Sequence, residues 1–533
     1  MKILGLHKDP WHNTGACVMV GEGILPNFAF LSEERIDRVK DSRAFPNGSA
    51  RACMDELGIS SVDEFDAVVM DYIERPDDWR LDQAKRPCST ENFLRGIDPD
   101  KIHIIDHHLC HAYASFMTSP FEDAAILIVD GRGSNQQTQS LFMGRKNSIE
   151  LIEMTDTLGI GLLYSAMTQH IGFGLLQEGK TMGLAPFGAN GDTSVYQFRG
   201  RFNGVTTEYS EICNEKDYSF KVDMPRVESF EEQALGAYAV QKECERAMLH
   251  LANYAKKITG AKYLCISGGV GLNSVANHAV YASGIFQDVF INPAASDTGI
   301  PLGAAYYGYH ALGQMPRKAQ EVTPYTGPMY SDERIQKAVA SFEGYEVIKK
   351  NAMDHAIDLL ADNKIIGRFE GRSEMGPRAL GHRSLLMSPL LKENKDIMNK
   401  RIKFREAFRP FAPIVMEEHA DEYFVIDRPC KYMLMIPPVH PDKADIIPAV
   451  THVDGTARVQ TVTRDFNGRL YDILSAFRDK TGVPVLLNTS YNVAGEPIVE
   501  TPEDAIKFLI SNNIDALLIN EMLLVKAKCL NPI

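Results

Sequence analysis

Two histidines stand four residues apart in DHHLCHAYASF, residues 106–116. The stretch has the pattern of a helix, so His107 and His111 would share one face and both imidazoles could reach a single point. Such a pair either binds a metal or is packed into a core, and the pair alone does not decide between them. His108 lies about 100° away from that face, which predicts a structural role for it.

Two aspartates could complete a ligand set with these histidines. Asp130 ends an expected strand, and Asp297 precedes a helix rich in glycine and alanine, where it could equally be an N-cap. A set of imidazole nitrogens and carboxylate oxygens suits iron, zinc or manganese better than calcium. The predicted metal ligands are His107, His111, Asp130 and Asp297.

Two glycine-rich turns directly follow expected strands, in the stretches 128–135 and 265–280. Junctions of this kind expose N–H groups and the positive end of a helix dipole, which suit phosphate. A tight turn without a ligand explains either one alone, but two in one domain favour nucleotide binding. The candidate nucleotide ligands are Gly131, Gly133, Gly268, Gly269 and Asn273.

The C-terminal part of the chain concentrates basic side chains. Residues 400–409 carry five of them against one glutamate, in a chain whose net charge is −14. A run of charges usually forms a solvated face, but the adjoining RPFAP draws this segment into packed structure, where unpaired arginines are costly. Further anion-binding side chains are expected from arginines at 367–386 and 455–462 and from a polar turn at 488–490. Together they predict a pocket for a polyanion, although the chain has no Walker phosphate-binding motif.

The elements that position these residues alternate between strand and helix patterns, which predicts α/β architecture with helices covering mixed sheets. Residues 313–331 contain three prolines and no clear periodicity, so they are the expected linker. We expect a first domain at 1–325 and a second at 332–533, with no tandem repeat. Expected strands are 2–7, 15–20, 65–72, 124–130 and 262–267, and expected helices are 47–59, 106–116 and 233–258.

Composition narrows the class of protein. A chain of 533 residues exceeds what one core supports, and 44% hydrophobic with 24% charged residues is typical of a soluble globular protein. The acidic balance argues against a nucleic-acid binder, and no apolar run approaches the ~18–20 residues of a membrane span. Nine scattered cysteines without a Cys-x-x-Cys pair indicate reduced thiols and a cytoplasmic location.

The motifs in their order along the chain resemble the NodU/CmcH family of O-carbamoyltransferases: HNTGAC, DHHLCHA, VDGRGS, EGKTMGLAPFG, SGGVGLN and SDTGIPLGAA. The resemblance implies an N-terminal actin/hexokinase-like domain, related to the threonylcarbamoyl transferases, and a C-terminal domain similar to the YrdC/Sua fold. It also implies that the four metal ligands hold iron and that Mg²⁺ accompanies ATP. The family ligands of carbamoyl phosphate and ATP fall on Arg378, Arg383, Lys403, Arg405, Arg409, Arg458 and Ser490.

Two further positions follow from the resemblance. His12 falls where the family has a histidine near the transfer site, and Asn13 replaces the acid that follows it, which leaves the acceptor-side general base open. Lys180 lies in a family motif and could contact phosphate, with an exposed lysine as the alternative.

The implied activity has two reactions. Carbamoyl phosphate and ATP form carbamoyladenylate in the C-terminal domain, and the N-terminal domain transfers the carbamoyl group to a hydroxyl of a small-molecule acceptor that the sequence does not name. A homodimer is also implied. The alternatives are a metabolite kinase of the actin/hexokinase-like type and a non-catalytic ATP-binding module.

Overall fold

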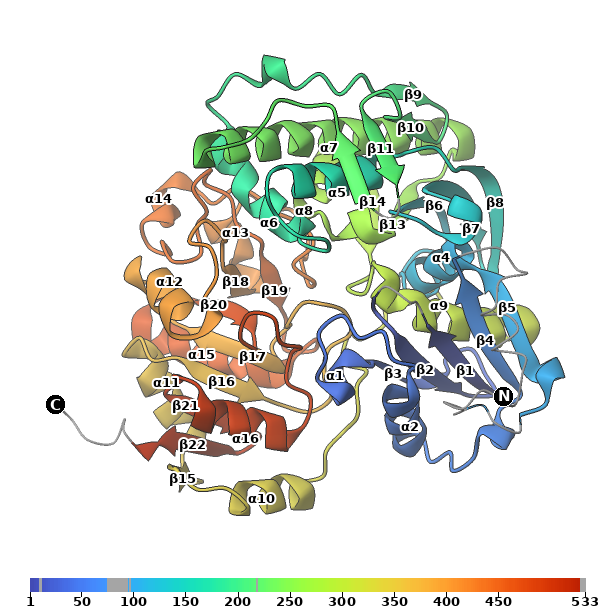
Figure 1. Cartoon of the computed structure of the whole chain (residues 1–533). Coiled ribbons are helices and arrows are strands. Elements are labelled where there is room, and N and C mark those ends of the chain that lie inside the picture. Colours follow the sequence, from blue (N-terminus) through green and yellow to red (C-terminus); the bar gives the residue numbers. More distant parts are fainter. Residues whose placement is uncertain (9–11, 74–93, 95–96, 217–218, 528–533) are drawn as a thin grey trace. The chain divides into compact units, whose positions relative to one another are not determined.

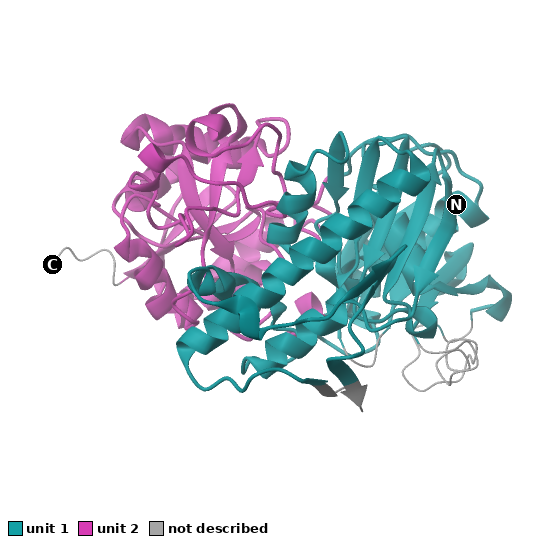
Figure 2. Ribbon diagram, turned by 90° about the horizontal axis from the view of Figure 1, so that it is seen from above, with its two compact units in different colours: residues 1–33, 41–322 teal, residues 34–40, 323–533 magenta. Residues whose placement is uncertain are grey.

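The computed structural model describes residues 1–533 except 9–11, 74–93, 95–96, 217–218 and 528–533 (Figure 1). The chain forms two compact units (Figure 2): unit 1 is Met1–Glu33 with Asp41–Val322, and unit 2 is Glu34–Lys40 with Thr323–Ile533. The division at 322/323 falls inside the proline-containing stretch 313–331. The membership of residues 34–40 in unit 2 was not expected from the sequence.

The first sheet of unit 1 has the strand order β3-β2-β1-β4-β5. β1 (Lys2–His7), β2 (Gly15–Val20) and β3 (Asn27–Ser32) form an antiparallel meander, whereas β4 (Ala67–Tyr72) and β5 (Ile102–Asp106) run parallel to β1. The strands expected at 2–7, 15–20 and 65–72 are confirmed. Because β1, β4 and β5 are parallel, their carboxyl ends meet at one edge of the sheet.

The second sheet repeats this arrangement, with the order β14-β13-β6-β7-β8. β6 (Asp123–Val129), β7 (Gln139–Arg145) and β8 (Ser148–Thr155) are an antiparallel meander, and β13 (Tyr263–Ser267) and β14 (Asp288–Ile291) run parallel to β6. The two sheets therefore share one topology although their sequences show no repeat. The structure confirms the expected α/β architecture with helices on mixed sheets.

Two helices place the site residues of unit 1. α4 (His107–Met117) begins after Asp106, whose side chain accepts a hydrogen bond from the Leu109 N–H at 3.0 Å, and it confirms the helix expected at 106–116. α4 packs closely on α9 (Ile300–Tyr307), because a side chain at Gly303 would collide with the Cys110 carbonyl. The histidine-bearing turn is thus held between β5 and α9.

A longer helix covers the second sheet. α7 (Phe230–Thr259) begins at a capping box formed by Ser229 and Glu232 and ends at Gly260, whose φ is 63°. It packs against α5 (Ile160–His170), α6 (Glu178–Leu184) and α8 (Ser274–Ala282) (Figure 1). Unit 1 also contains α2 (Asn47–Glu56), β9 (Arg201–Asn203), β10 (Thr206–Glu208), β11 (Cys213–Lys216) and β12 (Ser219–Val222).

Unit 2 is built on one mixed sheet with the order β15-β22-β21-β16-β17-β20-β18-β19. Its strands are β15 (Tyr345–Ile348), β16 (Ile366–Phe369), β17 (Arg383–Met387), β18 (Ala412–Met416), β19 (Gln460–Val462), β20 (Val485–Ser490), β21 (Ala516–Ile519) and β22 (Met522–Lys526). Its helices are α1 (Glu34–Asp37), α10 (Asp332–Ala340), α11 (Ala352–Ala361), α12 (Glu393–Met398), α13 (Ala420–Tyr423), α14 (Pro441–Ala444), α15 (Gly468–Thr481) and α16 (Pro502–Ser511).

The N-terminal segment 34–40 is fastened to the rest of unit 2 by its two arginines. Arg38 donates to the carbonyl oxygens of Ile498 at 2.6 Å and Pro497 at 2.9 Å. Arg35 is buried and lies 3.8 Å from the Glu500 carboxylate. A short helix taken from early in the sequence therefore completes the C-terminal unit.

The described cysteines (17, 53, 110, 213, 244, 265 and 430) are all buried, and Cys88 and Cys529 lie outside the described residues. Of the helices that the structure describes, none combines the length and the apolar character needed to cross a bilayer.

Candidate functional site

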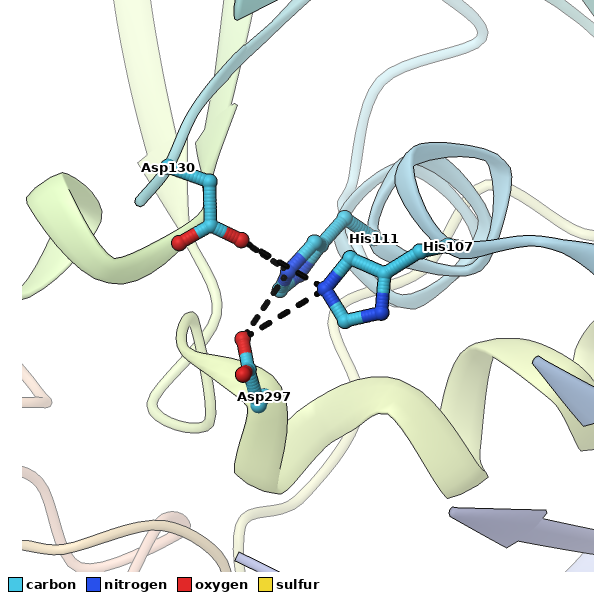
Figure 3. Close-up of side chains that lie close together, drawn as sticks. All are labelled: His107, His111, Asp130 and Asp297. Carbon is cyan, nitrogen blue, oxygen red and sulfur yellow. Dashed lines mark hydrogen bonds and ion pairs between the residues drawn. The ribbon is translucent and has the colours of Figure 1, made fainter. Parts of the chain in front are cut away.

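His107, His111, Asp130 and Asp297 come together in unit 1, all buried (Figure 3). The histidines lie on α4, Asp130 directly follows β6, and Asp297 opens a short 3₁₀ turn before α9. His111 Nε2 is 3.0 Å from Asp130 Oδ2 and 3.4 Å from Asp297 Oδ1, and His107 Nε2 is 3.5 Å from each of the same oxygens. One atom from each side chain thus faces a common point, with all four atoms within 4.8 Å of one another.

The surroundings of Asp130 and His111 decide which atoms face that point. Asp130 Oδ1 accepts hydrogen bonds from the N–H groups of Gly131 at 2.8 Å and Gly269 at 2.9 Å, which leaves Oδ2 for the cluster. The Ser267 hydroxyl donates to the Ala295 carbonyl at 3.0 Å, so it accepts from His111 Nδ1 at 3.2 Å. With its proton on Nδ1, His111 presents a lone pair on Nε2.

The electrostatics of the cluster favour a cation. Burial opposes a charge on either imidazole, but contacts with Asp130 and Asp297 outweigh it, so the pKa of His107 lies well above its usual value and that of His111 is also raised. Burial likewise opposes ionisation of the two carboxyls, and the histidines nevertheless lower the pKa of both. A divalent metal ion would supply the same positive charge in place of these protons.

The donor set fits a first-row transition metal. Two imidazole nitrogens and two carboxylate oxygens are a ligand combination found for zinc, iron and manganese. His107 Nε2 is buried and has no hydrogen-bond partner among the residues that the structure describes, as a nitrogen reserved for a metal would be. We infer that these four residues can hold such an ion.

Asp297 joins the cluster to His12. The alternative that it caps a helix is wrong, because its side chain caps neither the 3₁₀ turn that it opens nor α9. While Oδ1 faces the two histidines, Oδ2 lies 3.8 Å from His12 Nδ1. His12 also lies 3.0 Å from the Asn13 amide nitrogen, and its side chain is 24% exposed. It therefore lies between the buried cluster and solvent.

The glycine turns support this cluster. The Gly131 and Gly269 amides hold Asp130, and those of Gly133 and Gly268 donate to the carbonyls of Gln137 at 2.7 Å and Ala295 at 2.8 Å. A side chain at Gly133 would lie 2.6 Å from the His108 ring. The amides that were expected to face phosphate thus have acceptors within the protein.

The other two N-terminal candidates lie in packed surroundings. The Asn273 side chain caps α8 through the Ala276 N–H and exchanges hydrogen bonds with Gln241 at 3.0 and 3.2 Å. Lys180 is half-buried on α6, with its amino group 5.6 Å from the centre of the Phe173 ring. Nucleotide contacts at these two positions remain predictions.

In unit 2, most of the predicted anion ligands form one group. This cation cluster consists of Arg378, Lys403, Arg405, Arg409 and Arg458. Burial and the charges of their neighbours in the group lower the pKa of Arg378 to about 10 and that of Arg405 to about 9, and lower the pKa of Lys403 and Arg458 well below their usual values. The Nε atoms of Arg378 and Arg458 have no hydrogen-bond partner among the described residues.

Few acidic groups balance these cations. Glu406 lies 3.9 Å from Arg409 and partly offsets its charge and that of Arg405. Lys403 is buried against neutral groups, with its amino group 2.9 Å from both oxygens of Asn492 and 3.2 Å from the Ser490 hydroxyl. Gathering like charges in this way is unfavourable without an anion, so the cluster has the properties of an anion site.

Comparison with known proteins gives the family. Residues 81–306 match the model described as carbamoyltransferase N-terminus, and residues 357–526 match that described as carbamoyltransferase C-terminus. Nodulation protein NolNO of Sinorhizobium fredii is 33% identical over 96% of this chain and 79% of its own. The chain belongs to the carbamoyltransferase family. Nodulation protein NolO of Bradyrhizobium diazoefficiens is also 33% identical, over 79% of each chain.

The solved structures are more distant from this carbamoyltransferase. HypF of T. kodakarensis aligns with a TM-score of 0.36 and 13% identity, covering 60% of this chain and 50% of that chain. The family resemblance inferred from the motifs is confirmed by the family models and by the nodulation proteins, so the chain is a transferase of carbamoyl groups.

Arg383 stands apart from the cation cluster of the carbamoyltransferase. It is fully buried, and its guanidinium donates to the carbonyls of Glu370 at 2.7 Å and Gly371 at 3.0 Å and lies 3.9 Å from the Glu500 carboxylate. It also stacks on Phe369, 3.7 Å from the ring centre. Its nitrogens are used within the protein, which indicates a structural role in place of the expected ligand role.

Two residues that hold predicted ligands were not predicted themselves. The Ser267 hydroxyl orients His111 through a hydrogen bond to Nδ1, and two oxygens of Asn492 accept hydrogen bonds from the Lys403 amino group. Each lies close in sequence to a predicted motif, since Ser267 directly precedes Gly268 and Asn492 follows Ser490 by two positions. Small polar residues beside a ligand motif are therefore the signal that could have found them.

Replacing Gly268 with alanine should destabilise the carbamoyltransferase by about 3 kcal/mol or more. Gly268 has a φ of 91°, and a side chain there would collide with the Val129 carbonyl just before Asp130. Denaturant unfolding of G268A and G131A tests this, because a side chain at Gly131 meets nothing within 4 Å. Equal losses in the two variants would contradict it.

Proposed function

We propose that this carbamoyltransferase is ATP-dependent and works in two steps. In unit 2, carbamoyl phosphate, ATP and water give carbamoyladenylate, pyrophosphate and phosphate. In unit 1, an acceptor hydroxyl attacks the carbamoyl carbon, the bond from that carbon to the AMP oxygen breaks, and AMP leaves. The observation that carries the proposal is the presence of both a His/Asp cluster and a cation cluster in one chain.

The cation cluster supports the first step by positioning anions and neutralising their charge. Arg378 and Arg458 have half-buried guanidinium groups with nitrogens that lack protein partners among the described residues. Each charged hydrogen bond from such a group contributes about 1.5–3 kcal/mol, so a few of them can hold a triphosphate without a Walker loop. Mg²⁺ accompanying ATP would bridge its phosphate oxygens.

The His/Asp cluster supports the second step. When bound, a divalent metal, Fe²⁺ by family resemblance, stabilises negative charge on a substrate oxygen. Asp297 lies between the proposed metal position and His12, since one of its oxygens faces the ligand point and the other faces His12. We assign His12 to accept the proton of the acceptor hydroxyl, because it lies next to the cluster and is partly exposed.

His12→Ala should lower carbamoyl transfer by about 10²–10⁴-fold, the usual contribution of a general base. Formation of carbamoyladenylate, which we place in unit 2, should be unchanged. The measurement is the rate of carbamoylated product set against pyrophosphate release, with exposed His355→Ala as the control. Unchanged transfer in H12A with intact acceptor binding would remove His12 from the mechanism.

The acceptor is expected to be a hydroxylated small molecule, either a sugar-like compound or a secondary metabolite. The relatives named as nodulation proteins are in keeping with modification of a natural product. A cytoplasmic location fits a chain whose cysteines are scattered without a Cys-x-x-Cys pair and whose proposed co-substrate is ATP.

Mass spectrometry of the products tests the proposed function. The full-length protein is supplied with ATP, carbamoyl phosphate and a panel of hydroxylated metabolites, and a carbamoylated acceptor together with AMP is the expected result. A metabolite kinase would instead give ADP and a phosphorylated acceptor. A non-catalytic module would bind ATP and release no AMP. Either of these results would overturn the proposal.

A further inference from the structure

A buried carboxylate lies behind one of the metal-ligating histidines. Asp71 Oδ2 is 2.7 Å from His107 Nδ1, on the side of the ring away from Asp130 and Asp297. Asp71 Oδ1 is 2.7 Å from His7 Nδ1. The Asp71 side chain is 2% exposed, and both histidines are fully buried.

The first sheet brings these three residues together. His7 ends β1, Asp71 lies near the end of β4, and His107 directly follows β5, and these strands are parallel neighbours. Their carboxyl ends therefore meet at the edge of the sheet from which α4 starts. The contact depends on residues that are 64 and 36 positions apart in the chain.

The hydrogen bond to Asp71 determines which ring nitrogen of His107 is free to bind a metal. A carboxylate accepts only, so His107 must carry a proton on Nδ1, and when a metal replaces the proton on Nε2 the lone pair of that nitrogen faces the common ligand point. A carboxylate behind a ligating histidine fixes the ring and increases its basicity toward the metal. We propose that Asp71, itself held by His7, is a positioning residue that orients His107 for metal binding. This inference rests on the proposed metal centre.

The two ligating histidines make hydrogen bonds of unequal strength on the side away from the ligand point. His107 donates to the carboxylate of Asp71 at 2.7 Å, whereas His111 faces the neutral Ser267 hydroxyl at 3.2 Å. Hydrogen bonds to an ionised acceptor are shorter and roughly twice as strong as those between neutral groups. Loss of Asp71 should therefore weaken metal binding more than loss of Ser267.

Titration of the metal-free, full-length protein with Co²⁺ against a competing chelator tests the inference. Asp71→Asn keeps the shape of the side chain and should weaken Co²⁺ binding about 10- to 100-fold, with an altered Co²⁺ absorption spectrum. Ser267→Ala should have a smaller effect. The matched control is Asp66→Asn, directly before the opposite end of β4, an exposed carboxylate that accepts from the Lys2 N–H at 2.8 Å. Thermal unfolding without metal checks that the variants fold.

The outcomes separate the inference from the metal centre. Equal affinity in the wild type and Asp71→Asn overturns the positioning role alone. Wild-type affinity no tighter than that of His111→Ala overturns the metal centre and this inference together. His7→Leu, which leaves Asp71 in place, should weaken binding in the same direction and gives a second measurement if Asp71→Asn does not fold. A second equivalent of metal that His7→Leu abolishes would make these residues ligands and overturn the proposal.

Discussion

Replacing His111 with alanine is expected to abolish carbamoyl transfer while carbamoyladenylate formation continues. The substitution removes the nitrogen that lies 3.0 Å from Asp130 and 3.4 Å from Asp297 and leaves two buried carboxylates with one imidazole. A metal ion contributes several kcal/mol of charge stabilisation, and about 1.4 kcal/mol corresponds to tenfold in rate. Transfer should therefore fall by about 10³-fold or more.

The measurements are the metal content of the purified variant, the rate of pyrophosphate release and the rate of product formation. His108→Gln is a matched control on the same helix, equally buried but turned toward the Ser140 hydroxyl at 2.7 Å. Burial lowers the pKa of His108 to about 3, so it is neutral and contributes no charge to the cluster. Equal loss of metal from the two variants would contradict the ligand assignment.

Replacing Arg458 with methionine should have opposite effects on stability and on activity. In the free protein, burial and the charges of Arg378, Arg405 and Arg409 disfavour its guanidinium, so the variant should be more stable without ligand. The same change removes a charged contact worth about 1.5–3 kcal/mol from the proposed site. Carbamoyladenylate formation should therefore fall at least about 10- to 100-fold.

Melting temperatures with and without ATP and carbamoyl phosphate, together with pyrophosphate release, test this prediction. Arg401→Met is the control, because Arg401 lies in the same basic segment but pairs with Asp515 at 3.0 Å. That variant should lose stability and keep its activity. If Arg458→Met is destabilised and fully active, the cation cluster is structural and not an anion site.

The parts of the site that the sequence predicted are those that depend on local geometry. The spacing of His107 and His111 determines their common face on any helix, and the glycines after β6 and β13 predict tight turns. A glycine in the sequence indicates that a side chain would not fit, but it does not indicate which atoms occupy the space. At Gly133 the space is occupied by the His108 ring, so the glycine is explained without a ligand.

The contacts that the sequence did not predict join residues that are far apart in the chain. Arg378 and Arg383 lie five positions apart in one motif, yet among the described residues only Arg383 meets a carboxylate, that of Glu500, more than a hundred positions later. Asp71 likewise reaches His107 only through the pairing of β4 with β5. The matching topology of the two sheets in unit 1 was also not predicted, because the sequence shows no tandem repeat.

The position of segment 34–40 has a consequence for dissecting the enzyme. The chain leaves unit 1 after Glu33, contributes α1 to unit 2, returns, and leaves again after Val322. A fragment that starts at Thr323 would lack Arg35, which lies 3.8 Å from Glu500, and Arg38, which donates to Ile498 and Pro497. One cut at 322/323 would therefore give a complete unit 1 but an incomplete unit 2, which needs residues 34–40 to be supplied from the N-terminal part of the chain.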